Sequence, residues 1–195
     1  MRRSRARAAA FTLVELMIVV ALVAIIAALA APSFRDMILV QRLRSINAQL
    51  VTDLALARSE AVSRGVFVGI RAMSNGGMSC YILYTRASLG TTPCGCTTTP
   101  RCTDAGTTEI RTVQIPADLS VTVQKLASQV ADSFTFDPRT GGMKLAPSDF
   151  GIYDTSGFQL ETSLDSTRKL RSAVSLSGRV TVCTPTGSPL GGSAC

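Results

Sequence analysis

Cysteine is the residue type in this chain with the clearest chemistry. The 195 residues include six cysteines, and cysteine thiolates bind zinc. The pair Cys94-Gly95-Cys96 lacks the usual two-residue gap of a zinc site, and the chain has no histidine, so we expect no metal site. An even count suits disulfides in an oxidising compartment. The sequence leaves the pairing open among the six candidates, which are Cys80, Cys94, Cys96, Cys102, Cys183 and Cys195.

The absence of histidine also argues against catalysis. It removes the commonest general base and both the Ser-His and Cys-His nucleophile pairs. The sequence contains no Gly-rich phosphate loop followed by Lys-Ser or Lys-Thr, and no Gly-x-Ser-x-Gly elbow. We therefore expect a protein that is not an enzyme and needs no cofactor.

Basic residues gather near the C-terminus. No acidic residue follows Asp165, whereas four basic residues do: Arg168, Lys169, Arg171 and Arg179. Such a group can contact the phosphates of a nucleic acid, in which case binding weakens with salt. A solvated loop of mixed charge explains the same residues without a ligand. The net charge of +7 says little, because four arginines lie in the first seven residues and leave 16 basic against 13 acidic residues.

Residues 11–31 form an apolar run in which only Thr12 and Glu15 are polar. A helix of this length spans a bilayer core of about 30 Å. The arginines before it favour a cytoplasmic N-terminus. An ordinary secretory signal has its small residues after the apolar stretch, but here three alanines, residues 8–10, precede it. Cleavage at the alanines would remove the basic leader and leave the apolar helix on the protein.

The string Ala10-Phe11-Thr12-Leu13-Val14-Glu15-Leu16 resembles the class III signal of type IV pilins and type II secretion pseudopilins. The resemblance implies that a prepilin peptidase cuts between Ala10 and Phe11 and methylates the new amine of Phe11. It also implies that the apolar helix forms the core of a helical filament with other pilins or pseudopilins. Pro32 resembles the helix-bending proline of these families. Ala10 departs from their pattern, since glycine is usual before the cut.

Glu15 invites a functional interpretation because a carboxylate in mid-membrane costs roughly 2.5 kcal/mol or more. One interpretation is that Glu15, close to the new N-terminus, simply reaches the headgroups. The other is that it pairs with the cationic amine of Phe11 on a neighbouring subunit and sets the axial register of the assembly. We favour the second interpretation.

Residues 33–65 carry an apolar stripe at steps of three and four, which predicts an amphipathic helix that ends at Gly65. The stripe consists of Leu39, Leu43, Ile46, Leu50, Leu54, Ala57 and Ala61. We expect a sheet to pack on this stripe. Arg58 and Glu60 are expected to form a hydrated face at the helix end.

After Gly65 the apolar period changes to two, which predicts strands. The predicted strands are residues 66–70, 80–84, 109–115, 119–123, 133–136, 173–176 and 179–183. Turn signals lie at Asn75-Gly76-Gly77 and at residues 136–142. Residues 87–108 are rich in Thr, Gly and Pro and are expected to form a long surface loop.

Three segments resemble the GspH/FimT family, whose members are minor pseudopilins of type II secretion and minor pilins of type IV pili. They are residues 53–65, residues 136–142 and Leu176-Ser177-Gly178-Arg179-Val180-Thr181-Val182-Cys183. The resemblance implies an α+β, pilin-like fold in which a long N-terminal helix packs on an antiparallel β-sheet domain. The expected organisation is a leader at 1–10, a membrane or filament-core helix at 11–34, an amphipathic helix at 35–65 and a β-rich domain at 66–195.

The family resemblance implies a minor pilin or pseudopilin that primes or caps a type IV pilus. The chain is then a single-pass protein of the bacterial inner membrane with a periplasmic C-terminal domain, before it enters the tip of a pilus or pseudopilus. One alternative is an H-type tip subunit of a type II secretion system.

A DNA-binding minor pilin for natural transformation is the other alternative. Relatives that bind DNA use a Gly-Arg-x-Arg element, of which this chain keeps Gly178 and Arg179 but has Thr181 in place of the second arginine. Cys183 and Cys195 are expected to close a tail loop like that of many pilins. One cysteine of the Thr-rich loop is expected to reach Cys80 or the tail.

Overall fold

The computed structural model describes residues 12–145 and 157–195. They belong to two compact units, an N-terminal unit, Met1–Ile38, and a globular unit, Leu39–Cys195. Helix α1 (Leu13–Arg64) contributes residues to both units. The predicted leader and cleavage position lie outside the described residues.

Within the globular unit, the predicted apolar stripe of α1 is the buried face of the helix. Leu43, Leu50, Leu54, Ala57 and Ala61 have no exposed surface. The helix stops where the sequence predicts, because Gly65 adopts a left-handed conformation with φ of 65°. The amide of Val66 then donates to the carbonyl oxygen of Ala61 at 3.3 Å, the six-to-one bond of a Schellman cap.

The first sheet is antiparallel, with strand order β3-β2-β1-β5-β6. Its strands are β1 (Phe67–Asn75), β2 (Met78–Arg86), β3 (Thr108–Ile115), β5 (Ser133–Phe136) and β6 (Met143–Lys144). The predicted turn at Gly76-Gly77 joins β1 to β2, since Asn75 lies opposite Met78 in the register.

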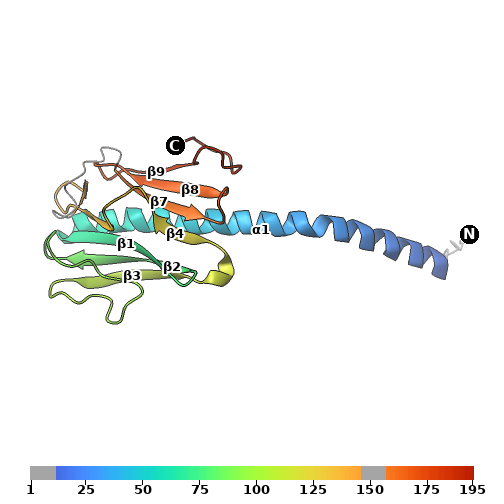
Figure 1. Cartoon of the computed structure of the whole chain (residues 1–195), viewed down its shortest axis with the longest axis horizontal. Helices are drawn as coiled ribbons and strands as arrows, with labels where there is room; N and C mark the ends of the chain where they lie inside the picture. Colours follow the sequence, from blue (N-terminus) through green and yellow to red (C-terminus); the bar gives the residue numbers. More distant parts are fainter. Residues whose placement is uncertain (1–11, 146–156) are drawn as a thin grey trace, which may run out of the picture. The chain divides into compact units, whose positions relative to one another are not determined.

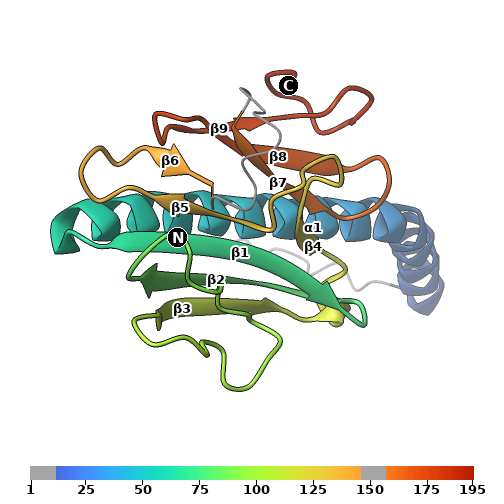
Figure 2. The ribbon, with the colours of Figure 1, turned by 60° about the vertical axis from the view of Figure 1, so that its left-hand side comes forward.

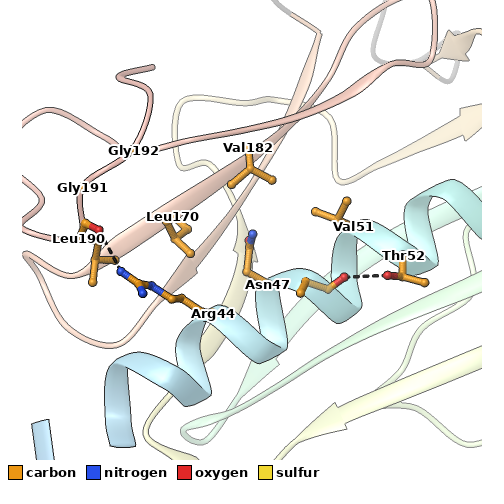
Figure 3. Close-up of a pocket in the computed structure, with 10 residues that line it drawn as sticks. Arg44, Asn47, Val51, Thr52, Leu170, Val182, Leu190, Gly191 and Gly192 are labelled. Atoms are coloured by element: carbon orange, nitrogen blue, oxygen red, sulfur yellow. Dashed lines mark hydrogen bonds between the residues drawn. The ribbon is translucent and has the colours of Figure 1, made fainter. Parts of the chain in front are cut away.

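The second sheet is also antiparallel, with strand order β4-β7-β8-β9. Its strands are β4 (Thr122–Lys125), β7 (Phe158–Ser163), β8 (Lys169–Val174) and β9 (Val180–Cys183). Figures 1 and 2 show β1, β2 and β3 on one side of the globular part of α1 and β7, β8 and β9 on the other. Strand β9 is an edge of its sheet, and the side chain of its Val182 points towards the groove along α1 (Figure 3).

One hydrophobic core joins α1 to both sheets. Leu54 of the helix, Phe134 of the first sheet and Phe158 of the second belong to the same buried cluster. The rings of Phe134 and Phe158 lie 4.8 Å apart. The buried carboxylate of Asp53 adds a polar connection, because it accepts a hydrogen bond from the Tyr81 hydroxyl at 2.6 Å and pairs with Arg111 at 2.9 Å. The predicted α+β class, with a long helix packed on antiparallel sheet, is confirmed.

Three details of the strand prediction are wrong. Residues 119–123 are not one strand, because the 3-10 helix η1 (Ala117–Leu119) and a left-handed Ser120 interrupt the chain before β4. The strand predicted at residues 173–176 extends past the end of β8, which stops at Val174. The chain turns there, because the Gly178 amide donates to the Ser175 carbonyl oxygen. Strands β6 and β7 were not predicted, although the alternation in Phe158–Ser163 indicates a strand.

The segment between β2 and β3 is more than a surface loop. Disulfides Cys80–Cys96 and Cys94–Cys102 join it to the sheet and to itself. Cys94 and Cys96 pack in a second apolar cluster with Ile82 and Tyr84. The buried Arg86 side chain donates to the carbonyl oxygens of Ser88, Leu89 and Thr91 and so fixes the start of the loop. Backbone carbonyls and cystines thus give this long loop its own buried contacts.

Candidate functional site

The first described residue, Thr12, belongs to the N-terminal signal and shapes the start of α1. Thr12 caps α1, since its hydroxyl accepts a hydrogen bond from the amide of Glu15 at 3.2 Å. Thr12 and Glu15 thus have the spacing of a capping box, and the acidic residue falls in the first helical turn. Ala10 and Phe11 lie outside the described residues. Pro32 falls within α1, but its side chain is not described, so the bend assigned to it stays a prediction.

The described part of the N-terminal unit presents apolar side chains on every face. Every large hydrophobic residue from Leu13 to Leu29 is exposed, with fractions between 51% at Val19 and 75% at Leu29. By length and composition no single helix among the described residues qualifies as a membrane span, whereas Leu13–Leu29 and Ser33–Arg64 qualify when taken together. Burying one such side chain is worth about 1.5–3 kcal/mol, so this surface has a strong tendency to leave water.

The basic residues between Arg168 and Arg171 each contact a carboxylate. Arg168 pairs with Asp165 at 2.7 Å. Lys169 and Arg171 pair with the buried Glu161 of β7 at 3.0 and 3.4 Å. Hydrogen bonds from the Arg168 amide and guanidinium hold the pKa of Asp165 below its usual range. Residues 169–174 form a strand in which the buried residues Leu170, Ser172 and Val174 alternate with residues that include Lys169 and Arg171. The solvated loop expected for this segment is therefore wrong.

Arg179 lies at the opposite end of β8 from Arg168. Ser175 and Arg179 close the β8–β9 turn, where the Ser175 amide donates to the Arg179 carbonyl oxygen at 2.9 Å. Seven residues of extended chain separate Arg168 from Ser175, which corresponds to about 23 Å. The structure therefore does not gather the four basic candidates into one cluster.

Arg179 instead belongs to a junction that sequence reasoning missed. Nη2 of Arg58, on α1, donates to the carbonyl oxygen of Ser177 at 3.1 Å. A Cβ on Gly178 would overlap the carbonyl oxygen of Gly141 and lie 3.1 Å from Arg58 Nε. Arg58 therefore does not belong to a freely hydrated face, which corrects the expectation. Glu60 does face the helix surface and pairs with Arg64.

The second turn of this junction is held by Asp137. Its carboxylate accepts hydrogen bonds from the amides of Arg139 and Thr140 at 2.8 and 3.1 Å and pairs with Lys144. The Lys144 ammonium group and these amides lower the pKa of Asp137 to about 2. The Met143 amide donates to the carbonyl oxygen of Leu176, which attaches this turn to the β8–β9 turn.

A groove of about 790 Å³ lies between α1 and the second sheet with its C-terminal tail (Figure 3). Its apolar lining includes Val51, Leu170, Val182 and Leu190. At one end Arg44 donates to the carbonyl oxygen of Leu190 at 3.1 Å. The tail that forms this end is closed by the disulfide Cys183–Cys195.

Asn47 is the buried polar residue of the groove, with 4% of its surface exposed. Its Oδ1 accepts hydrogen bonds from the hydroxyls of Thr162 and Ser172 at 3.1 and 3.0 Å. Its Nδ2 points into the groove towards Val182 (Figure 3) and donates to no acceptor among the described residues. Nothing in the sequence pattern singles out this asparagine.

Comparison with known families gives two matches. The model of the type II transport protein GspH matches residues 47–178, and the prokaryotic N-terminal methylation motif matches residues 5–31. The chain belongs to the GspH family. A solved structure similar to this chain is the type IV minor pilin FimU of Pseudomonas aeruginosa, with 16% identity, a TM-score of 0.47, and coverage of 74% of this chain and 98% of that one. A search of curated proteins finds no match.

Membership of the GspH family makes the chain a type IV pilin-like structural subunit. The methylation motif and the family imply processing by a prepilin peptidase and assembly with other pilins. The three segments that resemble this family in the sequence meet at the junction of Arg58, Gly141 and Gly178. These residues therefore have a structural explanation, because they fix two turns to the end of α1.

Proposed function

We propose that the chain is a minor pilin that helps to prime or cap a type IV pilus. The observation that carries this proposal is the apolar surface of residues 13–29, exposed on every face. A bilayer buries it before assembly, and the helices of neighbouring subunits bury it in a filament. The basic leader keeps the N-terminus cytoplasmic and leaves the globular unit in the periplasm.

The disulfide between Cys183 and Cys195 supports the pilus assignment, because such a tail loop is commoner in minor pilins than in secretion pseudopilins. The alternative is an H-type tip subunit of a type II secretion pseudopilus. Deleting the gene in the source bacterium separates the two. Loss of surface filaments with normal protein secretion supports a minor pilin, whereas loss of secretion with normal filaments supports the alternative. Normal filaments and normal secretion together contradict both.

A second candidate function, DNA binding, is favoured by the position of Arg179. The turn that carries Arg139 and the turn that carries Arg179 touch through Gly141 and Gly178. Both arginines are exposed, and neither has an ion pair among the described residues. Two such cations on adjacent turns suit contact with phosphates.

A gel-shift series with the full chain in detergent micelles tests this function across several salt concentrations. Each phosphate contact that is lost lowers the salt slope by about one. We expect Arg179→Ala and Arg139→Ala to weaken binding and Arg171→Ala to leave it unchanged, because Arg171 pairs with Glu161. If Arg179→Ala retards DNA as strongly as the unmodified protein, Arg179 is not part of the DNA site. If only Arg171→Ala loses DNA binding, the site lies on the outer face of β8.

A further inference from the structure

We propose that the groove between α1 and β9 binds an extended polypeptide segment, which adds as a strand to the free edge of β9. The segment has short apolar side chains facing the groove and an acidic residue at the end next to Arg44. This inference holds for a partner in either a pilus or a secretion system, since it concerns the globular unit alone.

The outer edge of β9 offers unpaired backbone groups. Ala173 of β8 lies opposite Thr181 of β9. Two residues further along, the Ser175 amide donates to the carbonyl oxygen of Arg179, so these two residues also form a pair. The backbone N–H and C=O groups of successive residues in an antiparallel strand point alternately to its two neighbours. Those of Thr181 therefore point to β8, whereas those of Val180 and Val182 point away from it. Among the strands of the described chain, β9 pairs with β8 alone. Two residues therefore present N–H and C=O groups to an incoming strand.

The C-terminal tail already uses this edge one position further on. The Thr184 amide donates to the carbonyl oxygen of Ser193 at 2.8 Å, and the Cys195 amide donates to the carbonyl oxygen of Thr184 at 3.1 Å. Thr184 and Ala194 thus form a parallel bridge, which the Cys183–Cys195 disulfide closes. The edge accepts an extended segment at Thr184, and at Val182 it has no strand partner among residues 12–145 and 157–195.

The helix side of the groove leaves room for a strand. Ala48, Val51 and Thr52 line it, and all three have short side chains. The helical residues that line the groove run from Arg44 to Thr52, a rise of about 12 Å. A strand of four residues has nearly the same length, about 13 Å. The volume and length of the groove therefore suit one strand with short side chains.

Asn47 gives the groove a polar group that can donate a hydrogen bond to a ligand. The side chain is 4% exposed, its Oδ1 is satisfied by Thr162 and Ser172, and its Nδ2 points into the groove (Figure 3). This Nδ2 is accessible to solvent and has no acceptor among the described residues. A backbone carbonyl or hydroxyl of a bound segment supplies that acceptor.

The charge at one end of the groove defines one flank of the segment. Arg44 lies at the tail end of the groove, where it donates to the carbonyl oxygen of Leu190. Asp53, the acidic residue of the neighbouring helical turn, is buried against Tyr81 and Arg111 and does not neutralise Arg44. Glutamate or aspartate at the adjacent end of the segment complements this cation. A polypeptide is favoured over a lipid or nucleic acid because only a backbone in β-conformation satisfies the edge of β9.

The test uses a synthetic peptide of alternating valine and threonine with a glutamate at each end. Its binding to the full chain in detergent micelles is followed by fluorescence anisotropy, with protein-free micelles as the blank. Hydrogen exchange of the Val182 amide is measured in parallel. We expect the peptide to bind and to slow this exchange. A peptide N-methylated at alternate residues is equally apolar but cannot pair along one edge, so we expect its binding to be lost.

Two variants locate the site. Ala48→Lys fills the groove from an exposed helical position, and Gln49→Lys makes the same gain of charge at the adjacent exposed position outside the groove. Val182→Pro removes the backbone N–H group that points away from β8. An edge strand tolerates proline at such a position. We expect Ala48→Lys and Val182→Pro each to weaken binding by about tenfold or more and Gln49→Lys to leave it unchanged.

Three results overturn the proposal. They are failure of the parent peptide to bind, equal binding by Ala48→Lys and Gln49→Lys, and undiminished binding of the N-methylated peptide. The helix variants keep the test decisive if Val182→Pro does not fold.

Discussion

The guanidinium group of Arg58 donates a hydrogen bond to the carbonyl oxygen of Ser177, which lies 119 residues later in the chain and 3.1 Å away. The same side chain packs beside Gly141 and Gly178, at the two turns that follow β5 and β8. One residue of the helix thereby fixes two turns that come from different sheets.

Replacing Arg58 with alanine is expected to lower the free energy of unfolding by about 1–2 kcal/mol. A hydrogen bond from a charged donor is worth about 1.5–3 kcal/mol, and partial exposure of Arg58 reduces that figure. Chemical denaturation of the full chain in detergent measures the loss. Arg64→Ala is the matched control, because Arg64 pairs with Glu60 on the exposed helix surface and should cost less. Equal losses in the two variants contradict a special role for Arg58.

Gly178→Ala is expected to destabilise the protein more than Gly187→Ala. Both glycines have a left-handed backbone, with φ of 77° and 86°. Alanine in this conformation costs about 1–2 kcal/mol. Only at Gly178 does the new Cβ overlap a backbone atom, the carbonyl oxygen of Gly141, whereas at Gly187 it meets nothing within 4 Å. Thermal unfolding of both variants isolates the contact, and equal melting temperatures mean that the two turns are not in contact.

Stability is expected to fall in acid as Asp137 becomes protonated. Its pKa is lowered to about 2 in the folded protein, below the usual value of 3.8. Its contribution is therefore complete above about pH 4 and is lost as the pH falls towards 2. Asp137→Asn should flatten the pH dependence of urea unfolding between pH 5 and 2, with Asp118→Asn on the exposed η1 helix as the surface control. The pKa of Asp165 is also lowered, so part of the dependence of the unfolding free energy on pH remains in both variants. An unchanged slope in Asp137→Asn contradicts the prediction.

Glu15→Ala is expected to insert into the membrane normally but to enter filaments poorly, because the amine of Phe11 on a neighbouring subunit loses its partner. An immunoblot of sheared fibres measures incorporation. Thr12→Ala removes the helix cap and keeps the carboxylate, so it separates capping from charge pairing. Normal incorporation of Glu15→Ala defeats the register hypothesis. Poor incorporation of Thr12→Ala alone assigns the effect to the cap.

The sequence by itself determined the features that depend on local pattern. The apolar run before Pro32, the stripe from Leu39 to Ala61 and the Gly65 stop are periodic or single-residue signals, and each acts within a few residues of chain. The β1–β2 hairpin followed in the same way from Gly76-Gly77. Family membership could also be predicted, because its motifs are short continuous strings.

Only the tertiary structure decided which distant residues meet. No local rule places Arg58 against Gly141 and Gly178, separates Arg168 from Arg179 along β8, or aims the amide of Asn47 into a groove. These relationships depend on how β8 and β9 lie against α1 and on the pairing of six cysteines. Side-chain contacts across more than a hundred residues arise from packing in a shared core, which the order of residues along the chain does not specify.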